Sequence, residues 1–203
     1  MKGYKCQSIV VEGVDRLGKS TQTKLLVNHL RAQGKKVTFV KSPYNYKMTY
    51  RLIYWMLLNG WARKIPNVFQ VIHFLNKLLF QAFALPKMFK NNDFLVFDRW
   101  NISMWAYGIP DGANKWLTEK MFGFITEPDF TIILDGNPHI MGNGDSYESD
   151  VKYQQDVRSL YINWVVSHPC CVGQVNANQP VQVVFDDIKQ YIYEHSGVLK
   201  GTK

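Results

Sequence analysis

The sequence predicts an α/β domain of three layers, in which a five-stranded parallel sheet carries helices on both faces. Short runs of β-branched and aromatic residues alternate along the chain with longer segments of helical periodicity, which is typical of βαβ units. The short runs are continuously apolar, as expected for strands that are covered on both sides. The 203 residues show no internal repeat and no Ser/Gly-rich linker. We therefore expect a single domain over residues 1–203.

The expected strands lie at residues 8–11, 37–40, 94–97, 130–134 and, less regularly, 171–175. Helical periodicity falls between and after them, at residues 19–33, 50–58, 66–85, 149–166 and 181–193. Gly34 is placed to end the first helix, and Pro66 is placed near the start of the third. The polar stretch 136–149 is too long for a simple connection. It predicts either a disordered loop or a functional lid at about residues 136–150.

The formal net charge of +8 is concentrated in the first part of the chain. Residues 1–60 contain eleven Lys or Arg and two acids, whereas residues 125–203 contain five and ten. A basic first half indicates an anionic ligand or partner. Solvated lysines that only keep a protein in solution would give the same balance, so charge alone does not decide between the two.

Composition excludes several classes of protein. With 46% hydrophobic and 20% charged residues, the chain is neither disordered nor fibrous. Three cysteines, two of them adjacent, do not build a disulfide framework, and no apolar leader opens the sequence. We therefore expect a cytoplasmic protein. The most apolar stretch, residues 68–85, is interrupted by polar side chains, so no membrane span is expected.

The strongest local signal is the string GVDRLGKS at residues 13–20, a complete G-x4-G-K-[ST] phosphate-binding loop between a predicted strand and a predicted helix. Its glycines turn backbone N–H groups toward a phosphate, and the helix N-terminus adds partial positive charge. Lys19 is expected to reach the β- and γ-phosphates of a nucleoside triphosphate, and the Ser20 hydroxyl to ligate Mg²⁺. The expected ATP-binding residues of this loop are Gly13, Val14, Asp15, Arg16, Leu17, Gly18, Lys19, Ser20 and Thr21.

Residues 12–22 read EGVDRLGKSTQ, and residues 97–100, at the end of the third expected strand, read FDRW. The first string is similar to the pattern around the loop of the thymidylate kinase family of nucleoside monophosphate kinases, and the second resembles that family's D-R-[YHW] step. Ser103, Ala106 and Tyr107 resemble its S-x-x-A-Y helix. Residues 127–129 (EPD), 145–148 (DSYE) and 153–154 (YQ) follow in the family's order. The resemblance covers nearly the whole chain.

The resemblance implies a P-loop kinase fold, a homodimer packed through helices, and ATP-dependent phosphorylation of dTMP with Mg²⁺. It assigns Arg16 to the transferred phosphoryl group, because residues 135–151 contain no Lys or Arg that could act from the lid. Asp15 is assigned to the sugar 3′-hydroxyl, although an Asp near a helix start is also an ordinary cap. Asp98 is assigned to Mg²⁺ with Ser20. The implied catalytic residues are Arg16, Lys19, Asp98 and Asp15.

For the acceptor nucleotide, the resemblance places Arg99 at the phosphate and the face of Ser103 and Tyr107 at the base and sugar. Asp98 and Arg99 could equally form a structural ion pair, and Tyr107 could be a core residue. Pro43 and Tyr147 are also implied on the acceptor side, and Asn176 and Ala177 beside the adenine of ATP. These last four rest on the resemblance alone.

The sequence departs from the family where the acceptor base is read. The family has F-x-x-x-R on this helix, whereas this chain has His73 and Lys77 at the two places, with Phe74 one position off. The resemblance implies that His73, Phe74 and Lys77 contact the acceptor nucleotide. Lysine does not make the forked pair of bonds that arginine makes. His73 could also be a buried core histidine. Asn45 stands where the family has an arginine for the acceptor phosphate. The alternatives to dTMP are therefore dUMP, a modified pyrimidine or another deoxynucleoside monophosphate.

A different class of protein also fits the basic first half, namely an ATP-dependent nucleic-acid-binding protein. It would need ordered acids on a Walker-B strand and a basic surface studded with aromatic residues. The resemblance instead explains residues 130–135 as the fourth strand of a kinase. We therefore expect ATP and a pyrimidine deoxynucleoside monophosphate as ligands, and neither nucleic acid nor membrane as a partner.

Overall fold

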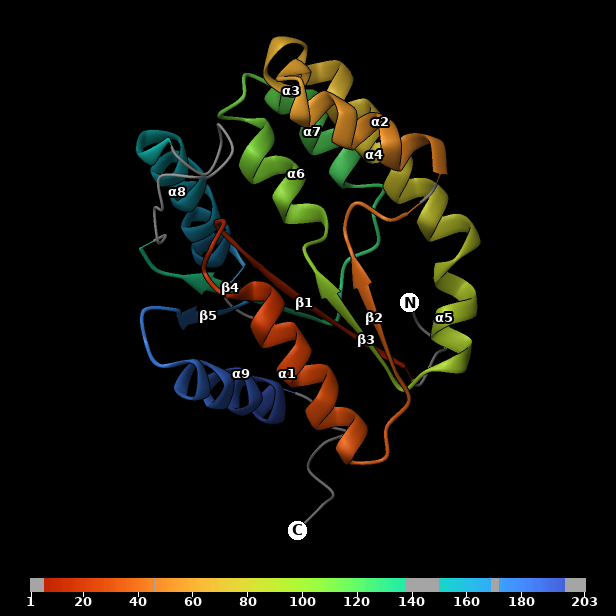
Figure 1. The fold of residues 1–203 in the computed structure, drawn as a ribbon, viewed down its shortest axis with the longest axis vertical. Coiled ribbons are helices and arrows are strands. Elements are labelled where there is room, and N and C mark those ends of the chain that lie inside the picture. The colour runs from red at the N-terminus through yellow and green to blue at the C-terminus, as the bar shows by residue number, and fades with distance from the viewer. Residues whose placement is uncertain (1–5, 46, 138–149, 169–171, 196–203) are drawn as a thin grey trace.

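The structure, a computed structural model, describes residues 6–45, 47–137, 150–168 and 172–195. Within these ranges five parallel strands form one sheet in the order β2-β3-β1-β4-β5 (Figure 1). This confirms the predicted fold class. The strands are β1 (Gln7–Gly13), β2 (Val37–Lys41), β3 (Phe94–Asp98), β4 (Phe130–Asp135) and β5 (Val172–Asn176).

The strand order places a topological switch point at the centre of the sheet. The chain leaves β1 toward β2 and β3 on one side, and continues to β4 and β5 on the other. Val11 of β1 is in register with Asp98 of β3, so these two strands end side by side. Open α/β sheets bind their ligands in the crevice outside the carboxyl ends of strands at such a point. The fold thus directs attention to the loops after β1 and β3.

Helices cover both faces of the sheet and its carboxyl edge. Two of them, α1 (Lys19–Ala32) and α9 (Val181–His195), pack against each other on one side. Several others gather beyond the ends of β2 and β3, at the top of the view in Figure 1. The remaining helices are α2 (Lys47–Leu58), α3 (Trp61–Lys64), α4 (Pro66–Phe83), α5 (Leu85–Asn91), α6 (Asn101–Gly108), α7 (Lys115–Phe122) and α8 (Val151–Ser167).

The expected helix at 66–85 is α4, and a second helix, α5, which was not expected, follows it directly. α4 ends at Phe83, and α5 begins at Leu85 with Pro86 in its first turn, so the two axes are bent by 44°. Proline lacks the N–H that would continue the ladder of α4. Among the described residues no single helix is long and apolar enough to cross a membrane, although this bent pair would pass on length and composition. The expected lid lies mostly outside the described residues, as does Cys171 of the expected fifth strand.

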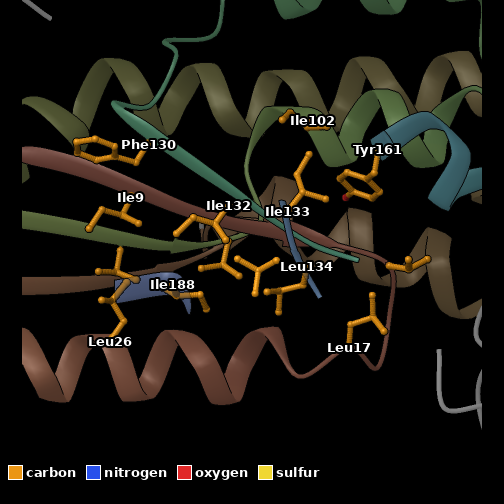
Figure 2. Close-up of a cluster of buried hydrophobic side chains, with 14 of the residues drawn as sticks. Ile9, Leu17, Leu26, Ile102, Phe130, Ile132, Ile133, Leu134, Tyr161 and Ile188 are labelled. Carbon is orange, nitrogen blue, oxygen red and sulfur yellow. The ribbon is translucent and has the colours of Figure 1, made fainter. Parts of the chain in front are cut away.

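The core lies on both sides of the sheet because successive strand residues point to opposite faces. In β1, Ile9 and Val11 join a large cluster, whereas Val10 joins a second, smaller one with residues of α4 and α5. Figure 2 shows the large cluster, with Leu26 of α1 on one side of the strands and Tyr161 of α8 on the other. These two packed layers hold the strand ends, and the loops that follow them, in fixed positions.

Candidate active site

A cavity of about 520 Å³ opens at the carboxyl ends of β1, β2 and β3. The phosphate-binding loop and the ends of β2 and β3 form one part of its wall, and α2, α4 and α6 form the rest. The cavity brings together many residues that the sequence predicted: Asp15, Arg16, Gly18, Lys19, Ser20, Thr21, Pro43, His73, Asp98, Arg99, Ser103 and Tyr107. Segments far apart in the chain thus meet at the switch point of the sheet.

The phosphate-binding loop has the backbone that its glycines predict. Gly18 has a φ of 79°, in the left-handed region, and caps the start of α1. A Cβ on Gly13 would lie 2.5 Å from the carbonyl oxygen of Leu134, so only glycine fits between β1 and β4 there. Val14 and Leu17 are buried in the large core cluster. These two side chains anchor the loop, and their contribution to a ligand is confined to the backbone.

Lys19 folds back over the loop. Its side chain is 7% exposed, its ammonium donates to the carbonyl of Val14, and its Nζ lies 3.9 Å from Asp15 Oδ1. Burial, with the neighbouring Arg99 charge, lowers the Lys19 pKa from 10.5 to about 7. A bound phosphate would add its negative charge to that of Asp15 and so favour the protonated form of Lys19. Lys19 is therefore placed to bind an anion in the cavity.

Ser20 and Asp98 meet across the end of the sheet. The Ser20 hydroxyl donates to Asp98 Oδ2 at 2.8 Å, which joins the start of α1 to the end of β3. Both groups offer hard oxygen ligands, the kind that Mg²⁺ prefers. Within the part of the chain that the structure describes, no group of three His, Cys, Asp or Glu side chains forms a metal cage. A pair of oxygens fits an ion that is otherwise held by phosphates and water.

Arg99 organises the charge of the cavity. It has a left-handed backbone, with a φ of 66°, and its guanidinium donates to the carboxylate of Asp15, to Tyr107 Oη at 2.9 Å and to Tyr161 Oη at 3.2 Å. Burial alone would lower the pKa of Arg99, but the Asp15 charge and the two tyrosines hold it well above its ordinary value. For Asp15 the effect of burial is the opposite, because burial alone would raise its pKa; the charges of Arg99 and Lys19 keep it below its ordinary value. The ion pair is therefore charged at neutral pH.

A buried carboxylate supports the Arg99 segment from below. Glu12 is fully buried, and its carboxylate accepts hydrogen bonds from the Trp100 backbone N–H at 2.7 Å and from Tyr161 Oη at 2.9 Å. Neither Glu12 nor Tyr161 was predicted as a site residue. An acid inside an apolar strand was a usable signal for Glu12. No comparable signal marked Tyr161, because its partner Arg99 lies 62 residues away in the chain.

On α4, the structure brings only part of the predicted base-reading set to the cavity. His73 lines it, together with Phe69 and Gln70, which were not predicted. Phe74 does not, because the step of one residue turns its ring toward Phe124, with ring centroids 6.3 Å apart. Phe74 was expected on the acceptor side, but in this structure its ring packs away from the cavity.

Lys77 also lies outside the cavity lining. The side chain is 1% exposed, and its Nζ donates to Ser42 Oγ and to the Trp100 carbonyl, each at 2.8 Å. It also lies over the Trp100 ring at 4.9 Å from the centroid. Lys77 is thus buried beneath the cavity, where it joins the segment after β2 to the segment after β3. The expectation that it contacts the base is not met by this geometry.

The other expected positions lie away from the cavity or outside the described residues. Asn176 ends β5, and the Ala177 backbone N–H donates to the Asp135 carbonyl at 2.6 Å, so both adjoin the loop that follows β4. Neither lines the cavity. Asn45 is exposed, and it is likewise absent from the lining. Tyr147 is not among the described residues.

Comparison with known proteins agrees with the site. Residues 11–188 match the thymidylate kinase family. A protein named probable thymidylate kinase, from Methanothermobacter thermautotrophicus, is 30% identical over 202 residues, which cover 95% of this chain and 97% of that protein. Thymidylate kinase from Idiomarina loihiensis is 24% identical over 203 residues, which cover 92% and 97%.

The solved structure of thymidylate kinase from Candida albicans has the same fold. It superposes with a TM-score of 0.75 at 21% identity, covering 93% of this chain and 92% of the other. At that identity the likeness concerns the fold, and it agrees with the P-loop kinase architecture described above. The family match extends over most of the chain, from the end of β1 to the middle of α9. The chain therefore belongs to the thymidylate kinase family and is a nucleoside monophosphate kinase.

Proposed function

We propose that this protein transfers the γ-phosphoryl group of ATP to dTMP, producing ADP and dTDP. One observation carries the proposal: a phosphate-binding loop and the half-buried cation Arg99 border the same cavity, whose remaining wall is largely aromatic and apolar. Two polyanions must approach each other in this reaction, so the protein has to supply cations and exclude water. A cavity with a cationic end and an apolar end suits two phosphates and one base.

The donor side is formed by the loop between β1 and α1. Its backbone N–H groups and the N-terminus of α1 would hold the phosphates of ATP, with Lys19 at the β- and γ-phosphates. Arg16 lines the cavity in the same loop, with a left-handed φ of 63°. We assign it to the phosphoryl group in transit, where charge is spread over the equatorial oxygens. Asn176 and Ala177 stay predictions for the adenine.

On the acceptor side we assign Arg99 to the phosphate of dTMP and Asp15 to the sugar hydroxyl. Asp15 already accepts from Arg99 and from Tyr107 Oη, the latter at 2.8 Å. A carboxylate has about four lone-pair sites, so it can accept a further hydrogen bond from a hydroxyl. Ser103, Tyr107, Pro43 and His73 complete this side of the cavity.

The paired oxygens of Ser20 and Asp98 would hold Mg²⁺. The ion, when bound, neutralises charge on the phosphates of ATP. The hydrogen bond of 2.8 Å between the two side chains already sets their separation. Asp98 is also held by the register of β3 between β1 and β2, so its position depends on the sheet and not on a loop.

Further properties stay predictions. We propose a single domain over residues 1–203, with a lid at about 136–150 and a cytoplasmic location. We also propose a homodimer packed through α2 and α4. These helices leave large apolar side chains exposed, among them Trp55 at 51%, Leu58 at 82% and Val68 at 50%. Large apolar side chains that are exposed on neighbouring helices are consistent with an association site.

The proposed reaction is tested with a panel of acceptors. The purified protein is assayed with ATP and Mg²⁺ against dTMP, dUMP, dCMP, dAMP and dGMP, and kcat/KM is determined for each. We expect dTMP to have the highest kcat/KM. The kcat/KM for dUMP should be about 10- to 200-fold lower, because dUMP lacks one methyl group in an apolar pocket. ATP turnover that ignores all five acceptors, or that responds to polynucleotides instead, would show that the proposal is wrong.

A further inference from the structure

The cavity has two chemically different ends. Its cations, Arg16, Lys19, Lys41 and Arg99, lie at the carboxyl ends of strands or in the segments that follow them, up to the first residue of α1. Over the described residues, α2, α4 and α6 contribute neither Lys nor Arg to the lining. Their contribution is mostly aromatic or apolar, and includes Tyr54, Leu57, Phe69 and Met104. A flat heterocycle fits this second end, and the polar side chains that these three helices offer to its edge are uncharged.

Gln70 is the uncharged group with the clearest need for a partner. The residue lines the cavity from α4 but is only 2% exposed. Its carboxamide Oε1 is buried and has no hydrogen-bond partner among the residues that the structure describes. A buried acceptor without a donor is destabilising, and native proteins retain few of them without a reason. A donor that arrives with a ligand would supply that partner.

Gly108, the last residue of α6, makes the space for this carboxamide. A Cβ at Gly108 would lie 2.4 Å from Gln70 Nε2 and 2.8 Å from Cδ. Any larger residue there would displace the amide, so close packing of α6 on α4 fixes where Gln70 lies. The same helix carries Ser103 and Tyr107, which line the cavity and which we assign to the acceptor nucleotide. The amide is therefore held against the helix that borders the acceptor.

His73 lies one turn further along α4, on the same face as Gln70. Its ring stacks on Phe69, with centroids 5.7 Å apart and planes 28° apart. Burial, and then the positive charge of Lys77, hold the His73 pKa well below its ordinary value. The imidazole is therefore neutral at neutral pH, and α4 presents an aromatic wall with an amide beside it and no cation.

We propose that the Gln70 carboxamide reads the hydrogen-bonding edge of the acceptor base, with its Oε1 accepting the N3–H of a 4-oxopyrimidine. Thymine and uracil carry this N–H, whereas N3 of cytosine is an acceptor and would face Oε1 without a proton. The base is thus selected by a neutral amide, because the lysine at the expected base-reading position is buried elsewhere. This assignment rests on the proposed function, since it requires a pyrimidine monophosphate in the cavity.

The test pairs a change in the protein with a change in the ligand. The wild type and Gln70→Met are compared on dTMP and on N3-methyl-dTMP, which lacks the N3 proton. Methionine keeps the length and flexibility of glutamine but lacks the amide. We expect N3-methylation to lower kcat/KM of the wild type by about 10- to 100-fold. Gln70→Met should lose a comparable factor on dTMP, should lose little more on N3-methyl-dTMP, and should keep the wild-type KM for ATP.

Gln190→Met is the matched control, because Gln190 lies at an exposed position of α9, where its amide donates to Glu194. It should behave as the wild type on both acceptors. Equal kcat/KM of the wild type on dTMP and N3-methyl-dTMP would overturn the assignment, and this comparison does not depend on a variant that folds. An equal penalty of N3-methylation in Gln70→Met and in the wild type would overturn it as well. Absence of transfer to dTMP would overturn the proposed function together with it.

Discussion

At the scale of single residues, two arginines have different proposed roles: Arg99 binds the acceptor phosphate and Arg16 acts on the transferred phosphoryl group. Arg99 is held by three side-chain partners and a strained backbone, so its guanidinium is placed before any ligand arrives. Arg16 lies in the phosphate-binding loop on the donor side. A left-handed φ at a non-glycine residue is costly and persists only where surrounding contacts impose it. Both arginines have one, at the two loops where charge must be placed accurately.

Arg16→Ala should lower kcat strongly while KM for ATP changes much less. A cation that acts mainly on the transition state is worth about 10³-fold or more in turnover, and residues 135–151 contain no Lys or Arg to replace it. Steady-state kinetics with ATP and dTMP check this. Lys24→Ala, at an exposed position of α1, is the control and should leave kcat unchanged. Wild-type kcat in Arg16→Ala would remove Arg16 from the reaction.

Residues in contiguous motifs were predictable, and residues placed by packing were not. The phosphate-binding loop and the Asp98–Arg99 pair follow from short strings next to strand ends, where the backbone fixes the geometry. Gln70 belongs to no such string, and its role depends on Gly108 of another helix. Lys77 stood at the expected position in the chain, but its long side chain bonds to Ser42 and Trp100 beneath the cavity. Spacing along a helix does not determine where such a side chain ends.

At the scale of elements, α4 links the cavity wall to the layer beneath it. Its cavity-facing residues, Phe69, Gln70 and His73, precede Lys77 and Phe80, which are buried below. Lys77 is a buried cation whose hydrogen bonds go to neutral oxygens. Burial lowers its pKa from 10.5 to about 7; Glu12 opposes this shift and Arg99 adds to it. The folded protein therefore binds the Lys77 proton more weakly than the unfolded chain does.

This difference predicts a pH-dependent stability. Between pH 7 and the ordinary lysine pKa of 10.5, the unfolded state holds a proton that the folded state has released, so the stability of the wild type rises with pH. Relative to Lys77→Met, which has no such proton, the free energy of unfolding of the wild type should increase by up to about 1.4 kcal/mol per pH unit. Below pH 7 the difference between the two proteins should be constant.

Urea unfolding of both proteins at about pH 7 and about pH 9 measures the effect. Lys115→Met, at a position on α7 that is 69% exposed, serves as the control. We expect the free energy of unfolding of the wild type, minus that of Lys77→Met, to be larger at about pH 9 than at about pH 7. If this difference is the same at both pH values, Lys77 does not release its proton near neutrality.

The helices illustrate what periodicity predicts. The five long helices were expected within a few residues of their observed bounds, except for the break at Ala84. The short helices α3, α5 and α7 were not expected. Segments of four to eight residues are too short to show a period of 3.6. These short helices all pack against α4, and α3 also packs against α2, so their positions follow from tertiary packing.

At the scale of the whole molecule, the sheet determines where the reaction can occur. All five strands were predictable because parallel strands buried on both faces read as continuous apolar runs. Their order is a property of the fold, and it puts β1 beside β3 so that the phosphate-binding loop faces Asp98 and Arg99. The donor and acceptor halves of the cavity thus come from neighbouring strands that are separated by more than eighty residues of chain.

Direct transfer of phosphate between two nucleotides is the central claim, and the fate of the γ-phosphate tests it most directly. The protein is incubated with γ-¹⁸O-labelled ATP, Mg²⁺ and dTMP, and the products are resolved by mass spectrometry. We expect the label in the β-phosphate of dTDP, with one ADP formed for each dTDP and none formed when dTMP is omitted. Label recovered in inorganic phosphate, with ADP formed whether or not dTMP is present, would contradict the account.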